Sequence, residues 1–150
     1  MQSMYFDDFA IGQAFDSPGR TVTDADLSLF CMLSGDWHPI HSDAEFARTT
    51  PFGQRIVGGV FGIALVTGMM GRWGIFEESV VAMTTLDDWR FRKPIFVGDT
   101  LRVRMTILAK TPSAGGTRGL VDRGFVLTNQ HGDIVQDGRS SALILRKPDG

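Results

Sequence analysis

The chain has 150 residues, a length at which one domain with a substantial core is expected. Hydrophobic residues make up 43% and charged residues 21%, as in ordinary globular proteins, and the formal net charge of -2 argues against a nucleic-acid-binding surface. The single cysteine, Cys31, excludes an internal disulfide framework and is expected to be a buried apolar side chain in a reducing compartment. We therefore expect residues 1–150 to form one domain.

The N-terminal stretch MQSMYFDDFAIG has no basic segment followed by an apolar one, so the sequence shows no secretory signal. Residues 56–71 are apolar, but they are fewer than the roughly 20 that cross a bilayer, and Arg55 and Arg72 flank them. A glycine-rich segment that is apolar all round is typical of a helix buried at the centre of a soluble fold, here from about Gly58 to Gly71. We therefore expect a cytoplasmic protein that does not contact a membrane.

The first half of the chain is predicted to be helical. In TVTDADLSLFCMLSG, Thr23 is the expected N-cap, Asp26 completes a capping box, and Gly35 is a natural C-terminal stop. The segment SDAEFARTT is predicted to form a short second helix, capped by Ser42 and ended before Pro51. The apolar central helix follows it.

The second half of the chain is predicted to be β-structure. Apolar and polar residues alternate through LRVRMTI, which is the period of a strand with one solvated face. Short turn-forming segments separate the β-rich stretches, so neighbouring strands should be antiparallel. The sheet is expected to wrap around the central helix in an α+β arrangement. The β-rich stretches are residues 80–95, 99–111, 116–129 and 133–147.

The stretch GDWHPIH contains two of the three histidines of the chain. Pro39 cannot continue a helix and pushes His38 toward an extended conformation, so Asp36 and His41 are expected on a loop after a helix end. A carboxylate and an imidazole that converge there form an acid–base pair, in which one group activates a water and the other handles a second proton. The alternative is that Asp36 caps the turn and His41 caps the next helix alongside Ser42.

A metal site is a further interpretation of this stretch, because Asp36, His38, His41 and Asp43 are all metal-type ligands. Their spacing matches no zinc pattern, and Pro39 hampers the placement of both histidines on one ion. We therefore expect no metal.

Gly58 and Gly59 open the predicted central helix, where backbone N–H groups are unpaired and the helix dipole favours negative charge. Glycine at this point lets a ligand approach the backbone closely. The arrangement is that of an oxyanion hole facing an acid–base pair, and we assign this role to Gly59. Gly62, Gly68 and Gly71 are instead expected to let the helix pack closely in the sheet.

LSGDWHPIHSDAEFA followed by FGQRIVGGVFGIALVTGMMG resembles the signature of the MaoC-like dehydratases, the (R)-specific enoyl-CoA hydratase group of hot-dog folds. That motif is G-D-x-N-P-[LIV]-H, followed by a short helix and an alanine–histidine–glycine start to the central helix. The flanking FDDFAIGQAF, RTVTDADLSLF and FRKPIFVGDTL agree as well, so the resemblance covers nearly the whole chain. His38 replaces the usual asparagine, and Gly58 stands where a histidine is common; both departures could alter the substrate.

The resemblance implies a hot-dog fold and the reversible hydration of a trans-2-enoyl-CoA to a 3-hydroxyacyl-CoA. A water held between Asp36 and His41 would add to carbon 3, with Asp36 as the base and His41 as its partner, although the reverse assignment stays open. The Gly59 N–H would bind the thioester carbonyl, and Thr67 matches a serine that supports the catalytic aspartate. Gly58 and His38 should lie near the acyl pocket. No metal or redox cofactor is implied, since coenzyme A arrives with the substrate.

Rival functions remain open from the sequence. One is a hydratase of a branched dicarboxylic, mesaconyl-type thioester or an acyl-carrier-protein dehydratase, in which His38 and the arginines of DWRFRKP could serve a second carboxylate. Another is a non-catalytic hot-dog subunit that binds acyl-CoA or only dimerises, but such a subunit should lack Asp36 or His41. A hot-dog thioesterase is a third alternative, but such enzymes lack a pair like Asp36 and His41 in front of the central helix.

Two partner expectations complete the interpretation. Arg90, Arg92 and Lys93 form the densest basic cluster, so they are candidates to hold the anionic end of coenzyme A, although solvated strand ends would explain them equally well. One sheet wrapped on one helix leaves edge strands unpaired, so a homodimer or a dimer of dimers is expected.

Overall fold

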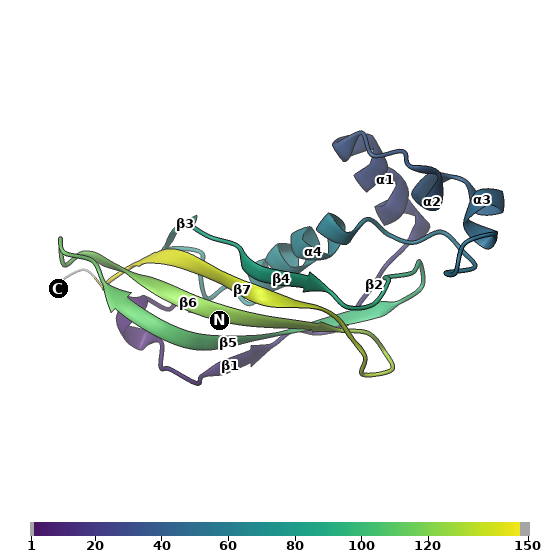
Figure 1. Ribbon diagram of the computed structural model, residues 1–150. Helices are drawn as coiled ribbons and strands as arrows, with labels where there is room; N and C mark the ends of the chain where they lie inside the picture. Colours follow the sequence, from purple (N-terminus) through teal and green to yellow (C-terminus); the bar gives the residue numbers. More distant parts are fainter. Residues whose placement is uncertain (1, 148–150) are drawn as a thin grey trace.

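The computed structural model describes residues 2–147 as an antiparallel sheet with one long helix across it. The sheet has seven strands in the order β1-β5-β6-β7-β3, with β2 also pairing with β5 and β4 with β7 (Figure 1). Every strand pairing is antiparallel, which is the α+β arrangement expected from the sequence. The elements are η1 (Phe6–Asp8), β1 (Ala14–Asp16), β2 (Arg20–Thr21), α1 (Asp24–Ser34), α2 (Pro39–Ser42), α3 (Ala44–Arg48), α4 (Gly59–Gly71), β3 (Val80–Met83), β4 (Asp87–Phe91), β5 (Thr100–Pro112), β6 (Arg118–Thr128) and β7 (Ile134–Leu145).

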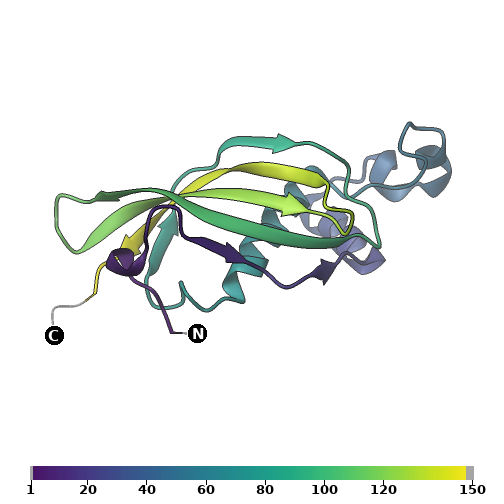
Figure 2. The same ribbon diagram turned by 90° about the horizontal axis from the view of Figure 1, so that it is seen from below.

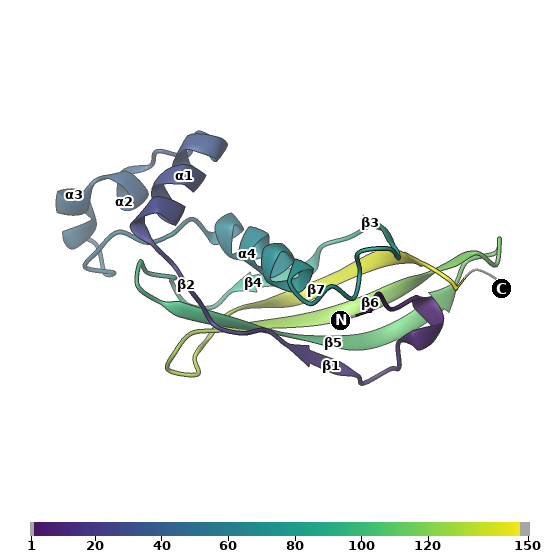
Figure 3. The ribbon, with the colours of Figure 1, turned by 180° about the vertical axis from the view of Figure 1, so that it is seen from behind.

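Helices α1, α2 and α3 lie beyond the N-terminal end of α4, where they overhang one end of the sheet (Figures 1 and 3). The hairpin that joins β5 and β6 lies at the opposite end, as the view in Figure 2 shows. Within residues 2–147 no helix is long and apolar enough to cross a membrane. The overhanging helices carry the GDWHPIH stretch, so they decide where the candidate site lies.

The start and end of α1 follow the sequence prediction. The Thr23 hydroxyl accepts a hydrogen bond from the Asp26 N–H at 3.2 Å, and the Asp26 carboxylate accepts one from the Thr23 N–H at 2.8 Å. This reciprocal capping box satisfies two N–H groups that the first helical turn leaves free. Gly35 ends the helix in the left-handed region, with φ of 74°. The Arg20 guanidinium adds an ion pair to Asp26 at 2.6 Å.

The segment after α1 differs from the expectation of a loop. Pro39 does not exclude a helix here, because it opens α2 at the first position, where a fixed φ suits a helix and the missing N–H costs nothing. The Nδ1 atom of His38 accepts a hydrogen bond from the Ile40 N–H at 3.2 Å and caps α2. The predicted cap of the next helix was also wrong, because Asp43 caps α3 in place of Ser42.

The predicted strand over residues 80–95 is two shorter strands. Both β3 and β4 pair with β7, and residues 84–86 between them belong to neither strand, although the Thr84 N–H still donates to the Ser141 carbonyl at 2.9 Å. Asp88 has φ of 50°, and the register shifts beside it, so a bulge interrupts this side of the sheet. In the described residues β3 pairs with β7 alone, so its other edge is open.

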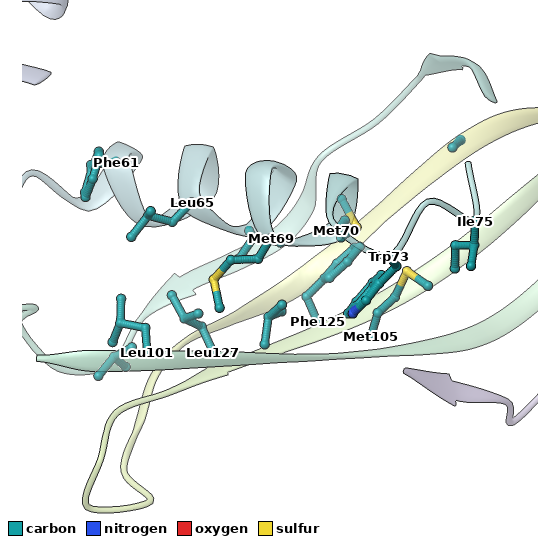
Figure 4. Close-up of a cluster of buried hydrophobic side chains, with 14 of the residues drawn as sticks. Phe61, Leu65, Met69, Met70, Trp73, Ile75, Leu101, Met105, Phe125 and Leu127 are labelled. Carbon is teal, nitrogen blue, oxygen red and sulfur yellow. The ribbon is translucent and has the colours of Figure 1, made fainter. Parts of the chain in front are cut away.

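Helix α4 buries one face against the sheet (Figure 4). The opposite face of α4 is exposed in this chain, where Val60 is 61% exposed, so the expectation of burial all round holds for one face only. A Cβ on Gly62 would lie 2.2 Å from the Gln136 amide nitrogen, which explains this glycine by close packing. Gly68 and Gly71 have nothing within 4 Å of such an atom, so close packing within this chain does not explain them. The buried α4 residues are Phe61, Gly62, Leu65, Val66, Met69 and Met70.

Candidate active site

His41 lies on α2 with its side chain only 12% exposed. Its Nδ1 atom lies 2.7 Å from the Ile56 carbonyl oxygen. A carbonyl oxygen only accepts hydrogen bonds, so Nδ1 must carry the proton in this contact. In the neutral imidazole Nε2 is therefore the unprotonated nitrogen, and it points toward the carboxylate of Asp36.

Asp36 uses its two carboxylate oxygens differently. Oδ1 accepts a hydrogen bond from the His38 N–H at 3.2 Å, which is the turn-capping role considered from the sequence. Oδ2 is left facing His41, 3.7 Å from Nε2. This separation is too long for a direct hydrogen bond, but one water can contact both atoms at ordinary hydrogen-bond distances. The carboxylate and the imidazole thus converge, and His41 does not cap the next helix.

The first turn of α4 lies beside this pair. A Cβ built on Gly58 would be 4.0 Å from Nε2 of His41. Among residues 2–147 the N–H groups of Gly59 and Val60 have no hydrogen-bond acceptor, as expected for the first turn of a helix. These two N–H groups and the positive end of the helix dipole are therefore available to an anionic or carbonyl oxygen.

Gln136 of β7 is a site residue that the sequence interpretation missed. Its side chain is 2% exposed, and its Nε2 atom donates a hydrogen bond to the Gly59 carbonyl at 2.9 Å. The indole N–H of Trp89 donates to Oε1 of Gln136 at 3.0 Å. This chain of bonds fixes the first residue of α4 on the sheet. The only signal in the sequence was an amide side chain within the predicted strand over residues 133–147. That this side chain faces the core follows only once the register of the strand is known.

His38 and Thr67 were also candidate residues. The His38 ring centroid lies 6.3 Å from that of His41, so His38 is near the pair while its Nδ1 atom caps α2. Thr67 lies about 12 Å along α4 from Gly59. Its hydroxyl donates to the Ala64 carbonyl at 2.7 Å. Within this chain Thr67 contacts neither catalytic candidate, so the structure does not bring it to Asp36.

The three basic candidates line two hollows beside β4 and its continuation. Arg92 and Lys93 line a hollow of about 550 Å³ together with Gly59. Each is ion-paired, Arg92 with Asp137 at 2.7 Å and Lys93 with Asp133 at 2.6 Å, and neither carboxylate lines this hollow. The hydrogen bond from Arg92 lowers the pKa of Asp137.

Arg90 lines a second hollow, which Arg92 and its partner Asp137 line as well. The structure therefore brings Arg92 and Lys93 close to the start of α4, and it does not bring Arg90 there.

Solved structures identify the fold class. Over 99% of its length the chain superposes on 98% of a protein described as the monoamine oxidase regulatory protein of Archaeoglobus fulgidus, with a TM-score of 0.91 and 32% identity. It also superposes, over 99% of its length, on 46% of a Mycobacterium tuberculosis protein described as having a double hot-dog fold, with a TM-score of 0.81 and 22% identity. The expected α+β hot-dog fold is confirmed.

Residues 8–124 match the family model described as MaoC like domain, so the chain belongs to the MaoC-like family. Protein MaoC of Klebsiella aerogenes is 36% identical over 107 residues, which are 71% of this chain and 31% of that protein, so the chain spans about a third of that relative's length. The (R)-specific enoyl-CoA hydratase of Rhodospirillum rubrum is 29% identical over 108 residues, 72% of either chain. The family includes hydratases and dehydratases.

Proposed function

We propose that the chain is an (R)-specific hydratase that converts a trans-2-enoyl-CoA to the (R)-3-hydroxyacyl-CoA and catalyses the reverse dehydration. The observation that carries this proposal is the separation of 3.7 Å between Asp36 Oδ2 and His41 Nε2 beside the start of α4. Both atoms accept hydrogen bonds when the imidazole is neutral, so together they can hold a water by its two hydrogens. The lone pair of that water is then free to attack carbon 3 of the enoyl group.

The tautomer of His41 supports a division of roles within the pair. Because the Ile56 carbonyl holds the Nδ1 proton, Nε2 can take a proton from the attacking water. The resulting imidazolium is stabilised by the adjacent Asp36 carboxylate and delivers the proton to carbon 2 on the same face. This makes His41 the proton carrier and Asp36 the group that orients the water, which is the reverse of the first assignment from the sequence.

The N–H groups of Gly59 and Val60 support stabilisation of the thioester oxygen. Negative charge develops on this oxygen when water adds to carbon 3, and fixed N–H donors stabilise it without reorganisation. Gln136 acts on the same step as a positioning residue, because its hydrogen bond to the Gly59 carbonyl holds the peptide in place. No step of this mechanism requires a metal or a redox cofactor.

Arg92 and Lys93 are the proposed contacts for the anionic end of coenzyme A. Both line the hollow beside Gly59, and a phosphate would replace Asp137 and Asp133 as their partners. Arg90 is a weaker candidate, because it does not line the hollow beside Gly59.

A homodimer is the proposed assembly, because both the edge of β3 and one face of α4 are open in the single chain. Val81 and Met83 on β3 are 47% and 52% exposed, and an unpaired apolar strand is normally covered by another chain. A pairing of β3 with its copy would continue the sheet across both subunits. Dimers could in turn associate as a dimer of dimers.

The experiment that tests the proposed function is a hydration assay with the purified chain. Crotonyl-CoA and a medium-chain trans-2-enoyl-CoA are offered, loss of the conjugated enoyl thioester is followed by absorbance, and the product is resolved on a chiral column. The account predicts the (R) product. A mesaconyl-type thioester and an enoyl acyl-carrier protein, offered in the same assay, test the two rival substrates. Binding of acyl-CoA without any turnover would favour the non-catalytic subunit.

A further inference from the structure

Arg123 is a buried cation without an acidic partner. It lies near the middle of β6, faces the core and is 3% exposed. Its Nε atom donates to the Ser140 carbonyl at 3.3 Å, and one terminal nitrogen donates to the Ser140 hydroxyl at 3.1 Å. The guanidinium carbon lies 5.6 Å and 5.5 Å from the ring centroids of Phe76 and Phe125. Among residues 2–147 no carboxylate forms an ion pair with it.

Such a group is expensive to keep in a core, because a buried charge needs a counter-charge or a full set of hydrogen bonds. Burial lowers the pKa of Arg123 to about 10, so the guanidinium still carries its charge at neutral pH. Only two of its five N–H donors are used, both on Ser140. The three remaining donors are available to an anion, and the charge meets only the rings of Phe76 and Phe125.

The surroundings of Arg123 connect it to the candidate active site. Ser140 and Phe125 line a small cavity of about 10 Å³ between α4 and the β3–β4 edge, together with Thr67 and Trp89, so a chain enters it only if the wall opens. The α4 residues in its wall share a helix face with Gly59 and Val60, because positions three and four apart align. The hollow beside Gly59 and this small cavity therefore follow one another along α4 and β4.

Strand β7 indicates the distance between the start of α4 at Gly59 and the guanidinium of Arg123. Gln136 lies beneath Gly59, and Ser140 beside Arg123 is four residues further, about 13 Å along an extended strand. An acyl chain of medium length covers this span when its thioester is bound at Gly59. Met70 and Met83 in the cavity wall are unbranched and flexible, so they can move aside for a chain.

We propose that Arg123 binds the terminal carboxylate of a medium-chain dicarboxylic enoyl thioester, with Ser140 holding the guanidinium in place. The inference rests on the proposed function, since it takes the thioester to be bound at Gly59. A planar guanidinium suits a carboxylate because two parallel N–H bonds can form. A mesaconyl-type thioester is a different substrate, because its second carboxylate lies beside the double bond and cannot reach Arg123.

The test measures binding of two saturated acyl-CoA ligands that differ only at the chain end, one with a methyl group and one with a carboxylate. Calorimetry on the wild-type chain should show the dicarboxylic ligand binding tighter, on the order of tenfold to hundredfold. Arg123→Met should abolish that preference, while Arg118→Met, at an exposed position of the same strand, should keep it. Saturated ligands make the readout independent of turnover.

The outcomes separate the inference from the proposed function. Equal affinity of the wild-type chain for both ligands, or a preference that survives Arg123→Met, overturns the role of Arg123. If Arg123→Met fails to fold, the wild-type preference and its loss in Arg123→Lys, which keeps the charge without the planar fork, decide the question. A carboxylate preference without hydration of any enoyl-CoA would uphold Arg123 and overturn the hydratase.

Discussion

Gln136 on β7 donates a hydrogen bond to the carbonyl oxygen of Gly59 at 2.9 Å, and this bond ties the sheet to the first residue of α4. The orientation of the Gln136 amide is unambiguous, because the Trp89 indole N–H can only donate and must meet the amide oxygen. The amide nitrogen is therefore left for Gly59. A side chain remote from the acid–base pair thus fixes the Gly59–Val60 peptide, and with it the direction of the Val60 N–H at the helix start.

Gln136→Met is expected to reduce kcat on enoyl-CoA by about 10- to 100-fold, because the Gly59–Val60 peptide no longer holds the Val60 N–H toward the oxyanion. The free energy of unfolding should fall by roughly 1–3 kcal/mol, since the Trp89 N–H and the Gly59 carbonyl lose their partner. Steady-state hydration assays measure kcat, and urea melts measure the free energy of unfolding. Gln54→Met, at an exposed position, is the control and should change neither. Unchanged kcat in a folded Gln136→Met chain would remove Gln136 from the site.

His38→Asn is expected to keep turnover within a few-fold of wild type while shifting the preference among enoyl-CoA substrates. Asparagine is a preferred N-cap residue and can replace the His38 ring as the cap of α2. Helix α2 and its residue His41 should therefore stay in place. His38→Ala should instead lower the free energy of unfolding by about 1 kcal/mol through loss of the cap. The comparison is made by kcat/KM across chain lengths. A complete loss of turnover in His38→Asn would make His38 a catalytic residue.

Local signals in the sequence were sufficient for much of the fold. Three predictions are confirmed: the Thr23–Asp26 capping box, the helix end at Gly35 and the alternation through β5. Each of these depends only on residues that are neighbours in the chain. The prediction of a loop at Pro39 was wrong, because proline both breaks and begins helices. Which of the two occurs depends on whether the preceding residue can cap the helix. His38 supplies that cap through a ring nitrogen, which is an uncommon way to do it.

The candidate site was predictable only where its residues are close in sequence. Asp36 and His41 are five positions apart, and the structure brings them together. Gln136 could not be found, because its role depends on the register of β7 beneath α4 and on no motif. Thr67 was placed with Asp36 by analogy alone, although two helical turns separate it from the helix start.

The acid sensitivity of the fold should depend in part on Asp26. The hydrogen bond from Arg20 lowers the pKa of Asp26 from 3.8 to about 2 in the folded chain. The ionised carboxylate therefore stabilises the fold above about pH 4, and this contribution of about 2 kcal/mol is lost as the pH falls from about 4 to about 2. Asp26→Asn should accordingly destabilise the chain at pH 7 and much less at pH 2, as measured by urea melts with wild type alongside. Equal destabilisation at both pH values would contradict this assignment.

The open edge of β3 leads to a prediction about assembly. Val81→Lys should convert a dimer to a monomer at micromolar concentration, because a charge would be buried where two β3 strands meet. Ile11→Lys is the matched control, since Ile11 is an exposed apolar residue before β1, on the opposite edge of the sheet. Sedimentation velocity measures both variants. A wild-type chain that sediments as a monomer would contradict the proposed dimer.

The central claim is that Asp36 and His41 act as one unit on a water, and a double-mutant cycle of hydration rates tests it most directly. Asp43→Asn serves as the control, because asparagine can also cap α3 and should leave the rate unchanged. Asp36→Asn and His41→Ala should each lower kcat/KM for a trans-2-enoyl-CoA by about 10²- to 10⁴-fold in a folded chain. The double variant should be no slower than the slower single variant. Losses that multiply, or a single variant with wild-type turnover, would contradict the account.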